Sequence, residues 1–362
     1  MEEKTPLYDC HVELKGKMVS FAGYLLPVQY EQGLVKEHLA VRNEVGIFDV
    51  SHMGEILVEG EDSLSYIQKL VTNDCSKMYD GQVKYSPICN EEGGVIDDLL
   101  IYKLNNNRYI LVVNAANREK DLKWMKANEF GNVTLSDISD DIALIAVQGP
   151  KSKQVLLKLM DEELLPKKYY SFKDKVNIAG CEAMVSKTGY TGELGYEIYC
   201  KSLDAKTIWN ELLEKGKDEG IVPCGLGCRD TLRLEAGMPL YGNELSDSIT
   251  PLEAGLSFTV KMNKENFIGK EAILNKGESN KVRVGIKITG RGIAREDCKV
   301  FYDDKEIGQT TSGTHLPYVD YAGAMAYVDK AYSSLGTKVL IQVRKRHVEG
   351  EIVDLPFYKR DN

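Results

Sequence analysis

The sequence predicts a multidomain α+β protein that ends in a small all-β domain. Its 362 residues are enough for about two or three domains with a sizeable core. As far as about residue 262, helical and strand-like stretches are mixed, whereas only short strands and turns follow from Lys281 onward. Between these parts, residues 263–280 are rich in Lys, Asn and Gly, which is typical of a linker.

Composition excludes several classes of function. The chain carries 46 Lys and Arg against 55 Asp and Glu, a net charge of −9, so it is poorly suited to binding nucleic acid. No apolar run reaches the ~20 residues of a membrane helix, and the early acidic residues argue against a signal or transit peptide. The eight cysteines form no Cys-x-x-Cys pair, which fits buried thiols in a reducing cytoplasm. We expect neither a metal nor a flavin, because the histidines lack metal spacing and no dinucleotide fingerprint is found.

A predicted meander of three strands contains the first candidate site. Amphipathic spacing predicts helices at 32–43, 63–71, 119–128, 152–160 and 203–216, and strands at 56–59, 82–89, 95–104, 108–115 and within 141–148. Tyr85, Asp98 and Asn114 lie on neighbouring strands of the meander and could meet on one face. An aromatic ring, a carboxylate and an amide on an apolar sheet would suit a flat, nitrogen-rich heterocycle. The alternative is a Tyr and an Asn at a sheet edge that bond to turns.

Two adjacent acids stand within the second strand of this meander, in Gly93-Gly-Val-Ile-Asp-Asp-Leu-Leu-Ile-Tyr102. Alternation places Asp97 on one face of the strand and Asp98, with Leu100 and Tyr102, on the other. One of the two must therefore point toward the more buried side, where an unpaired carboxylate costs several kcal/mol, roughly. A buried acid of this kind normally has a partner or a function. The alternative is that one of the two acids faces water and the other caps a turn.

A glycine-rich turn carries the next acids. In Thr188-Gly-Tyr-Thr-Gly-Glu-Leu-Gly-Tyr-Glu197, three glycines in seven residues indicate a backbone that closely approaches another group. Glu193 lies within the turn and is expected to face solvent. Glu197 lies in the following strand, where it could accept the two parallel N–H bonds of a 2-amino-pyrimidinone ring edge. Tyr190, held by the turn, could stack on such a ring.

Glycines also precede a short predicted helix at 228–235. Arg229 and Arg233 lie four residues apart on it; for Arg233 we expect a salt bridge, whereas Arg229 could reach an anionic ligand or hold Glu197. In the earlier stretch Phe48-Asp-Val-Ser-His-Met53, His52 is expected to be structural, and Met53 could form a polarizable wall for a flat ligand. The last part predicts strands at 282–288, 298–301, 306–311, 324–327 and 338–343, as in a small barrel or sandwich.

Three motifs together closely resemble the T-protein family of the glycine cleavage system. They are Gly93-Gly-Val-Ile-Asp-Asp-Leu99, Gly189-Tyr-Thr-Gly-Glu-Leu-Gly-Tyr-Glu197 and Cys224-Gly-Leu-Gly-Cys-Arg-Asp-Thr-Leu-Arg-Leu-Glu-Ala-Gly237. Supporting matches are Thr5-Pro-Leu-Tyr8, Phe48–Met53, Val147-Gln-Gly-Pro150 and Thr311-Ser-Gly313. The resemblance covers almost the whole chain, in order and without large insertions.

The resemblance implies an α+β fold of three domains around a central cavity, ending in a β-barrel. We assign a discontinuous first domain to 1–50 and 141–262, a second with the meander to 51–140, and the barrel to 281–362. The implied activity is a tetrahydrofolate-dependent aminomethyltransferase. Its substrate would be the aminomethyl group on the dihydrolipoyl arm of the H-protein, and its products methylenetetrahydrofolate, ammonia and the reduced arm. The P- and L-proteins of the same system are further possible partners.

The resemblance also implies roles for single residues. Asp98 would be the catalytic carboxylate, near folate N10 and the reacting carbon. Glu197 would bind the pterin edge, in a pocket lined by Met53, Tyr85, Tyr102, Asn114 and Tyr190. Arg229 would fix the ligand and its acidic neighbours, and Arg360 would meet the glutamyl tail.

Three other functions are the alternatives. A non-catalytic folate-binding protein of the iron–sulfur maturation type carries a Lys-Gly-Cys-Tyr-x-Gly-Gln type motif, whereas this chain has Gly-Leu-Gly-Cys228-Arg-Asp. The folate domain of sarcosine or dimethylglycine oxidising enzymes accompanies a flavin domain, and no fingerprint for one is found. A carrier module of the H-protein type would be shorter and would display a lysine hairpin for lipoylation.

Overall fold

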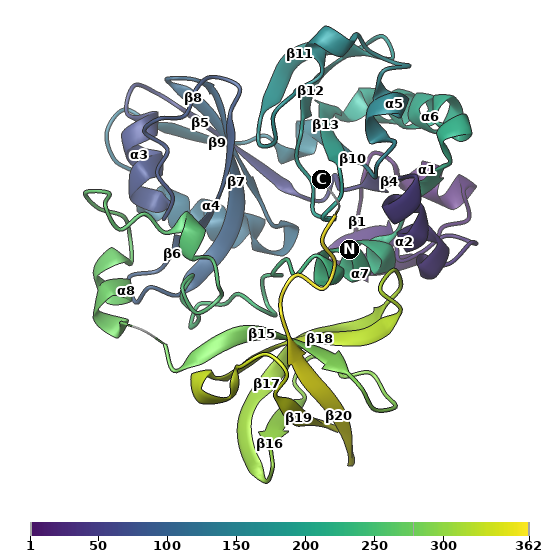
Figure 1. The fold of residues 1–362 in the computed structure, drawn as a ribbon. Coiled ribbons are helices and arrows are strands. Elements are labelled where there is room, and N and C mark those ends of the chain that lie inside the picture. Colours follow the sequence, from purple (N-terminus) through teal and green to yellow (C-terminus); the bar gives the residue numbers. More distant parts are fainter. Residues whose placement is uncertain (1, 278, 361–362) are drawn as a thin grey trace. The chain divides into compact units, whose positions relative to one another are not determined.

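The computed structural model describes residues 2–277 and 279–360, so residues 1, 278, 361 and 362 of the predicted domain and linker ranges lie outside the described residues. The α+β prediction is confirmed: helices accompany three open sheets, and the chain ends in a closed barrel (Figure 1). The chain divides into two compact units. The first unit runs up to Ser86 and includes Asp97–Gly189 and Glu193–Arg229. The second unit holds Pro87–Ile96, Tyr190–Gly192 and the residues from Asp230 onward.

The largest open sheet has six strands. Its order is β11 (Phe172–Ile178), β12 (Cys181–Ser186), β13 (Gly195–Lys201), β10 (Ile142–Gln148), β4 (Val45–Asp49) and β14 (Ile221–Pro223). Strand β10 is central and almost wholly buried, as its apolar sequence predicts. Helices α5 (Ser152–Leu156) and α6 (Ala205–Lys215) pack on this sheet, and α6 buries Ala205, Ile208, Trp209 and Leu212, the spacing of an amphipathic helix.

The predicted meander is part of a five-stranded sheet. The strand order is β6 (Val83–Cys89), β7 (Val95–Asn105), β8 (Arg108–Val113), β5 (Gly54–Glu59) and β9 (Thr134–Asp137). Helices α3 (Ser63–Leu70) and α4 (Arg118–Ala127) lie close to their predicted positions. The turn into β7 closes because the Asn90 side chain accepts the Gly94 N–H at 2.8 Å. Gly94 leaves no room for a side chain, since a Cβ there would lie 1.6 Å from the Asp247 carbonyl oxygen.

The last part of the chain is a closed barrel rather than a sandwich. Its strands follow the order β15 (Lys281–Ile288), β18 (Tyr321–Asp329), β17 (Lys305–Leu316), β16 (Lys299–Tyr302), β19 (Lys338–Val343) and β20 (Arg346–Val353). Five of these strands were predicted, although β17 and β18 are longer than expected. The sixth, β20, closes the barrel by pairing with both β19 and β15. The first residues of β20 are mostly polar, so the sequence pattern does not reveal this strand.

The remaining elements are small. Strands β1 (Glu3–Lys4), β3 (Tyr24–Pro27) and β2 (Met18–Phe21) form a three-stranded sheet in a part of the chain for which the sequence predicts no strand. Helices α1 (Tyr8–Glu13), α2 (Leu34–Asn43) and α7 (Leu226–Glu235) belong to the part of the chain before the linker, and α8 (Lys270–Lys276) lies within the predicted linker. The division into three domains around a central cavity stays a prediction. Among the described residues, none of these helices has the length and apolar sequence to span a membrane.

Candidate functional site

Asp98 is held by its neighbours on both sides in the sheet. The Tyr85 hydroxyl, from β6, donates to one Asp98 carboxylate oxygen at 2.8 Å, and the Asn114 amide, just after β8, donates to the other at 3.0 Å. The register of β7 and β8, in which Leu100 is opposite Val112, brings Asn114 to this position. The predicted meeting of the three side chains is therefore confirmed, whereas their roles stay predictions.

Burial and a second acid control the charge of Asp98. The side chain is only partly exposed, and this burial, together with the negative charge of Asp97, raises the pKa of Asp98 to about 7. The hydrogen bonds from Tyr85 and Asn114 oppose the shift because they favour the ionised form. A carboxyl with a pKa near neutrality can exchange protons with a substrate and can also carry a negative charge.

Asp97 is the fully buried member of the pair. It accepts hydrogen bonds from the backbone N–H of Asn114 at 3.1 Å and from the side-chain amides of Asn114 at 2.8 Å and Asn117 at 2.7 Å. Sequence reasoning left open which acid faced inward and missed Asn117 altogether. The signal was the polar spacing Asn114-Ala-Ala-Asn117 between an apolar strand and a helix, where side chains commonly bond to exposed backbone or to nearby acids.

Glu197, on β13, is another buried acid of the first unit. The Thr188 hydroxyl donates to it, and Thr188 in turn is hydrogen-bonded to Ser186. The Tyr102 hydroxyl lies 3.1 Å from the Ser186 hydroxyl and 2.8 Å from that of Tyr199, so a chain of hydroxyl groups supports Glu197. Tyr102 has no exposed area, so it supports the acid from within the fold, whereas the sequence places it in the lining of the pocket.

This chain of hydroxyls links Glu197 to the strand of Asp98. Tyr102 lies four residues beyond Asp98 on β7, about 13 Å along the strand. Ser186 ends β12, and Glu197 is paired with it across β12 and β13. The six-stranded and five-stranded sheets thus meet at Tyr102, and the strand that carries Asp98 also supports the group that holds Glu197.

Arg229, in α7, acts electrostatically on this region. Burial raises the pKa of Glu197, and both the Thr188 hydrogen bond and the positive charge of Arg229 oppose that rise. Burial, together with the positive charge of Arg229, lowers the pKa of His52 to about 4. His52 is therefore neutral at physiological pH, which agrees with its expected structural role. Met53 lies beside it in the turn between β4 and β5 and is partly exposed.

The glycine-rich turn approaches one side chain closely, as predicted. A Cβ at Gly189 would lie 2.1 Å from the Gln148 side chain, and one at Gly195 would lie 2.3 Å from it. The Gln148 amide donates to the backbone carbonyls of Thr188 at 3.2 Å and Tyr196 at 3.3 Å. Gln148 therefore positions the segment that presents Glu197.

The expectation that Glu193 faces solvent is wrong. Its carboxylate is buried and forms an ion pair with Arg42 of α2 at 3.2 Å. A turn was assumed to be exposed, but this turn lies against α2, and the buried arginine supplies the charge that a buried carboxylate requires.

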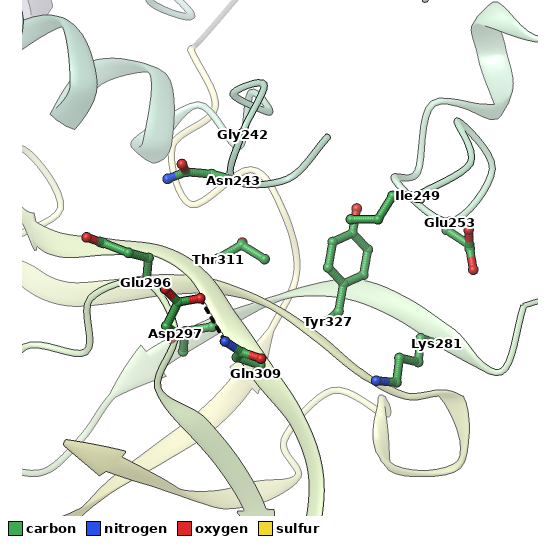
Figure 2. A pocket seen from close by; sticks show the side chains of 11 residues that line it. Gly242, Asn243, Ile249, Glu253, Lys281, Glu296, Asp297, Gln309, Thr311 and Tyr327 are labelled. Atoms are coloured by element: carbon green, nitrogen blue, oxygen red, sulfur yellow. Dashed lines mark hydrogen bonds between the residues drawn. The ribbon is translucent and has the colours of Figure 1, made fainter. Parts of the chain in front are cut away.

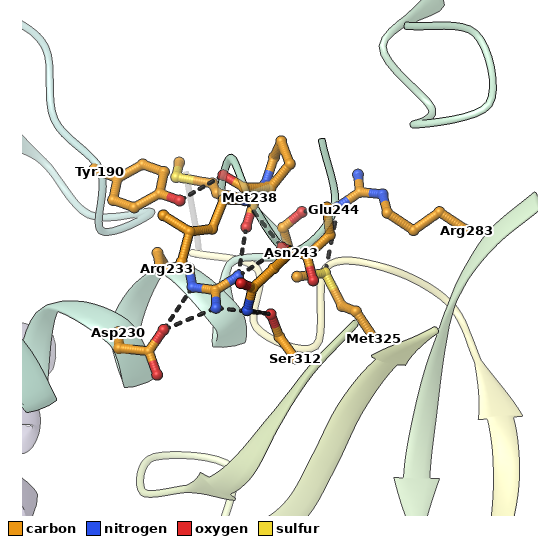
Figure 3. Close-up of polar contacts among 12 residues, drawn as sticks. Tyr190, Asp230, Arg233, Met238, Asn243, Glu244, Arg283, Ser312 and Met325 are labelled. Atoms are coloured by element: carbon orange, nitrogen blue, oxygen red, sulfur yellow. Dashed lines mark hydrogen bonds and ion pairs between the residues drawn. The ribbon is translucent and has the colours of Figure 1, made fainter. Parts of the chain in front are cut away.

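The second unit contains Tyr190, Arg233 and Arg360. The Tyr190 hydroxyl donates to the Pro239 carbonyl, and the ring is partly exposed. Arg233 is buried and forms ion pairs with Asp230 at 2.8 Å and Glu244 at 3.0 Å, which confirms its expected salt bridge (Figure 3). It also donates to the Ser312 hydroxyl at 2.8 Å. Arg360, near the C-terminus, is partly exposed.

A hollow of about 470 Å³ lies in the second unit, beside the barrel (Figure 2). Polar and charged residues outnumber apolar ones in its lining, and none of the predicted site residues contributes to it. Two of its acids already have partners in the fold: Asp297 accepts from Gln309 at 2.7 Å, and Glu253 accepts from Thr250 at 2.8 Å. The hollow therefore offers no unpaired charge at these two positions that would select a ligand.

Glu37, Cys224 and Cys228 form a buried group whose ligand atoms all lie within 4.8 Å of one another. The Glu37 carboxylate already accepts the backbone N–H groups of Tyr30 at 2.6 Å and Gly225 at 2.9 Å. Burial raises the pKa of both thiols, which keeps them protonated, whereas a metal ligand must be a thiolate. The contacts therefore favour a packing role for this group.

Comparisons with known proteins cover nearly the whole chain. Residues 7–264 match the family described as "GCVT N-terminal domain", and residues 281–359 match the "Glycine cleavage T-protein C-terminal barrel domain". A protein of Caldanaerobacter subterraneus subsp. tengcongensis named "Aminomethyltransferase" is 51% identical over 99% of this chain and 96% of its own length. A protein of Bacillus subtilis with the same name is 47% identical over 99% of this chain and 100% of its own length.

A solved structure supports the same relationship. The glycine cleavage system aminomethyltransferase T from Bartonella henselae has a TM-score of 0.92 to this chain, with 32% sequence identity, and the match covers 99% of each chain. The similarity therefore extends over both the α+β part of the chain and the C-terminal barrel.

Proposed function

Since the chain belongs to the glycine cleavage T-protein family and is an aminomethyltransferase of the glycine cleavage system, we propose that Asp98 is its catalytic carboxylate. Members of this family use tetrahydrofolate as co-substrate, and the activity implies the H-protein as partner. The observation that carries the proposal is the placement of Asp98: partly buried, held from both sides, and with a pKa raised to about 7.

The proposed reaction moves one carbon from sulfur to two folate nitrogens. The C–S bond of the aminomethyl group breaks, and its electron pair leaves on the sulfur. The resulting iminium-like carbon forms one bond to N5 and, as the C–N bond to ammonia breaks, a second to N10. The two protons from N5 and N10 balance the reaction, one going to the thiolate and one to the departing amine.

Asp98 contributes to this reaction in its ionised form. A negative charge beside the reacting carbon stabilises the positive charge that develops there, and the partly buried setting strengthens this interaction relative to bulk water. The same carboxylate can accept a proton from a folate nitrogen, because its raised pKa makes it a better base than an ordinary aspartate.

The remaining site residues are proposed to bind the folate. Glu197 would accept the N–H groups of the pterin edge, with Tyr102 and Thr188 as its supports and Arg229 as its counter-charge. Met53, Tyr85 and Asn114 would contact the ring system. Tyr190 and Arg360 stay predicted contacts, for the ring and for the glutamyl tail respectively.

The central experiment replaces Asp98 by Asn, which preserves shape and removes the charge. We expect Asp98→Asn to bind tetrahydrofolate with an affinity close to wild type, while turnover falls at least about 100-fold. Turnover is measured as ammonia and methylenetetrahydrofolate formed from aminomethylated H-protein, with and without tetrahydrofolate. Glu91→Gln is the control, because Glu91 is an exposed acid in the turn before the same strand. Wild-type turnover in Asp98→Asn would contradict the proposal.

We further propose that the H-protein interaction is transient and that the enzyme acts in the cytoplasm beside the P- and L-proteins. All eight cysteines are free, as expected in a reducing compartment. The chemistry proposed above needs neither a metal nor a flavin, in keeping with the sequence.

A further inference from the structure

A third acid lies behind the pair in β7. Asp121, in the first turn of α4, is fully buried, and its side chain lies beside that of Asp97, the neighbour that acts on it most directly. Neither Asp121 oxygen accepts an N–H or O–H from the residues that the structure describes. Two carboxyl groups in direct contact cannot both be ionised without a large repulsion, so one of them carries a proton.

The donors around the two acids decide which one keeps the charge. Asp97 accepts three N–H bonds, from Asn114 and Asn117, and such bonds stabilise a carboxylate. Asp121 has no such donors among the described residues, and the neighbouring carboxylate oxygens of Asp97 can only accept. The proton therefore belongs on Asp121, which donates it to Asp97. Burial and the charges of Asp97 and Asp98 raise the pKa of Asp121, while Lys120 opposes the shift.

Asn114 transmits this arrangement to the site. Its side-chain N–H groups donate to Asp97 at 2.8 Å and to Asp98 at 3.0 Å, and its backbone N–H is also fixed by Asp97. The orientation of the amide that holds Asp98 is thus set by Asp97.

We propose that Asp121 is a positioning residue: as a neutral acid it donates a hydrogen bond to Asp97, which keeps its charge, orients Asn114 and thereby holds Asp98 toward the substrate. The inference rests on the proposed function of Asp98 for its effect on catalysis, whereas the protonation of Asp121 can be tested without any activity.

The kinetic test compares two substitutions. In Asp121→Asn an amide N–H can still donate to Asp97, so turnover and the pH profile should stay close to wild type. In Asp121→Leu the donor is lost, and we expect turnover to fall about tenfold or more with little change in KM for tetrahydrofolate, because Asp98 loses its fixed position. The Asn114 hydrogen bond, which favours ionised Asp98, would weaken with it, so the acid limb of the profile should move to higher pH.

Glu119→Gln is the matched control, since Glu119 is an exposed acid in the same turn of α4. Equal losses in Asp121→Asn and Asp121→Leu would overturn the proposal, as would an unchanged profile in Asp121→Leu. If Asp121→Leu fails to fold, a loss of activity in Asp121→Asn would by itself overturn the proposal.

The spectroscopic test addresses the proton directly. The infrared difference spectrum between wild type and Asp121→Asn, both without substrate at pH 8, should show the carbonyl band of a protonated carboxylic acid that the variant lacks. Absence of that band from wild type would overturn the assignment. If the band is present but Asp98→Asn is fully active, the protonation of Asp121 stands and only the proposed catalytic role of Asp98 fails.

Discussion

At the scale of single residues, burial and the neighbouring charge of Asp97 determine the pH range in which Asp98 is ionised. Because its pKa is raised to about 7, Asp98 is ionised above this pH and progressively protonated below it. If the carboxylate is the active form, turnover should fall as the pH drops through about 7, by up to about tenfold for each further unit. Asp98→Asn should lack this acid limb.

Tyr85→Phe tests the contribution of one donor. The Tyr85 hydrogen bond favours ionised Asp98, so its loss should raise the pKa of Asp98 and move the acid limb to higher pH. A hydrogen bond worth about 0.5–1.5 kcal/mol corresponds to a shift of roughly half to one pH unit. The measurement is kcat against pH, with Tyr79→Phe, at an exposed tyrosine, as the control. A loss of activity that is equal at all pH values would contradict this explanation.

At the scale of elements, the glycine-rich turn and the end of β10 fit together as a pair. Gly195→Ala would place a methyl group 2.3 Å from the Gln148 side chain, and we expect a destabilisation of about 1–3 kcal/mol from the overpacking. The measurement is the shift of the urea unfolding midpoint.

The same contact predicts a specific coupling. On a Gln148→Ala background the added methyl group has space, so Gly195→Ala should cost clearly less there than in the wild type. If the losses of stability caused by Gly195→Ala and Gln148→Ala simply add in the double variant, the close approach of Gln148 does not explain why position 195 requires glycine. The single Gln148→Ala variant serves as the reference for this comparison.

The elements also show where sequence patterns are reliable. The meander, α6 and β10 were predicted because their apolar residues repeat with the period of a strand or helix, or form one buried run. The first small sheet, α8 and β20 were missed because each is short or polar, and its formation depends on pairing or packing with distant residues.

At the scale of the whole molecule, buried ion pairs join segments that are distant in the sequence. Within the second unit, Arg233 of α7 connects Glu244 with Ser312 of the barrel. We expect Arg233→Met to destabilise the protein by about 3–5 kcal/mol, because it leaves Glu244 buried without its positive partner. Thermal unfolding provides the measurement.

Two variants sharpen this prediction. Lys299→Met removes an exposed pair with Glu306 and should cost about 0–1 kcal/mol. Adding Glu244→Gln to Arg233→Met should restore part of the lost stability, since the unpaired charge is removed with it. If Arg233→Met loses no more stability than Lys299→Met, the buried ion pair contributes no more to stability than an exposed one.

The sequence by itself determined the α+β class, the terminal all-β part and the meeting of Tyr85, Asp98 and Asn114, because local periodicity and short turns fix the register of neighbouring strands. It also determined the family, through motifs that remain contiguous in the chain. Only the tertiary structure decided that Asp97 faces inward, that Glu193 is buried against Arg42, and that Asp121 meets Asp97. Each of these depends on two segments far apart in sequence, and the charge of a buried acid is set by partners that no local pattern reveals.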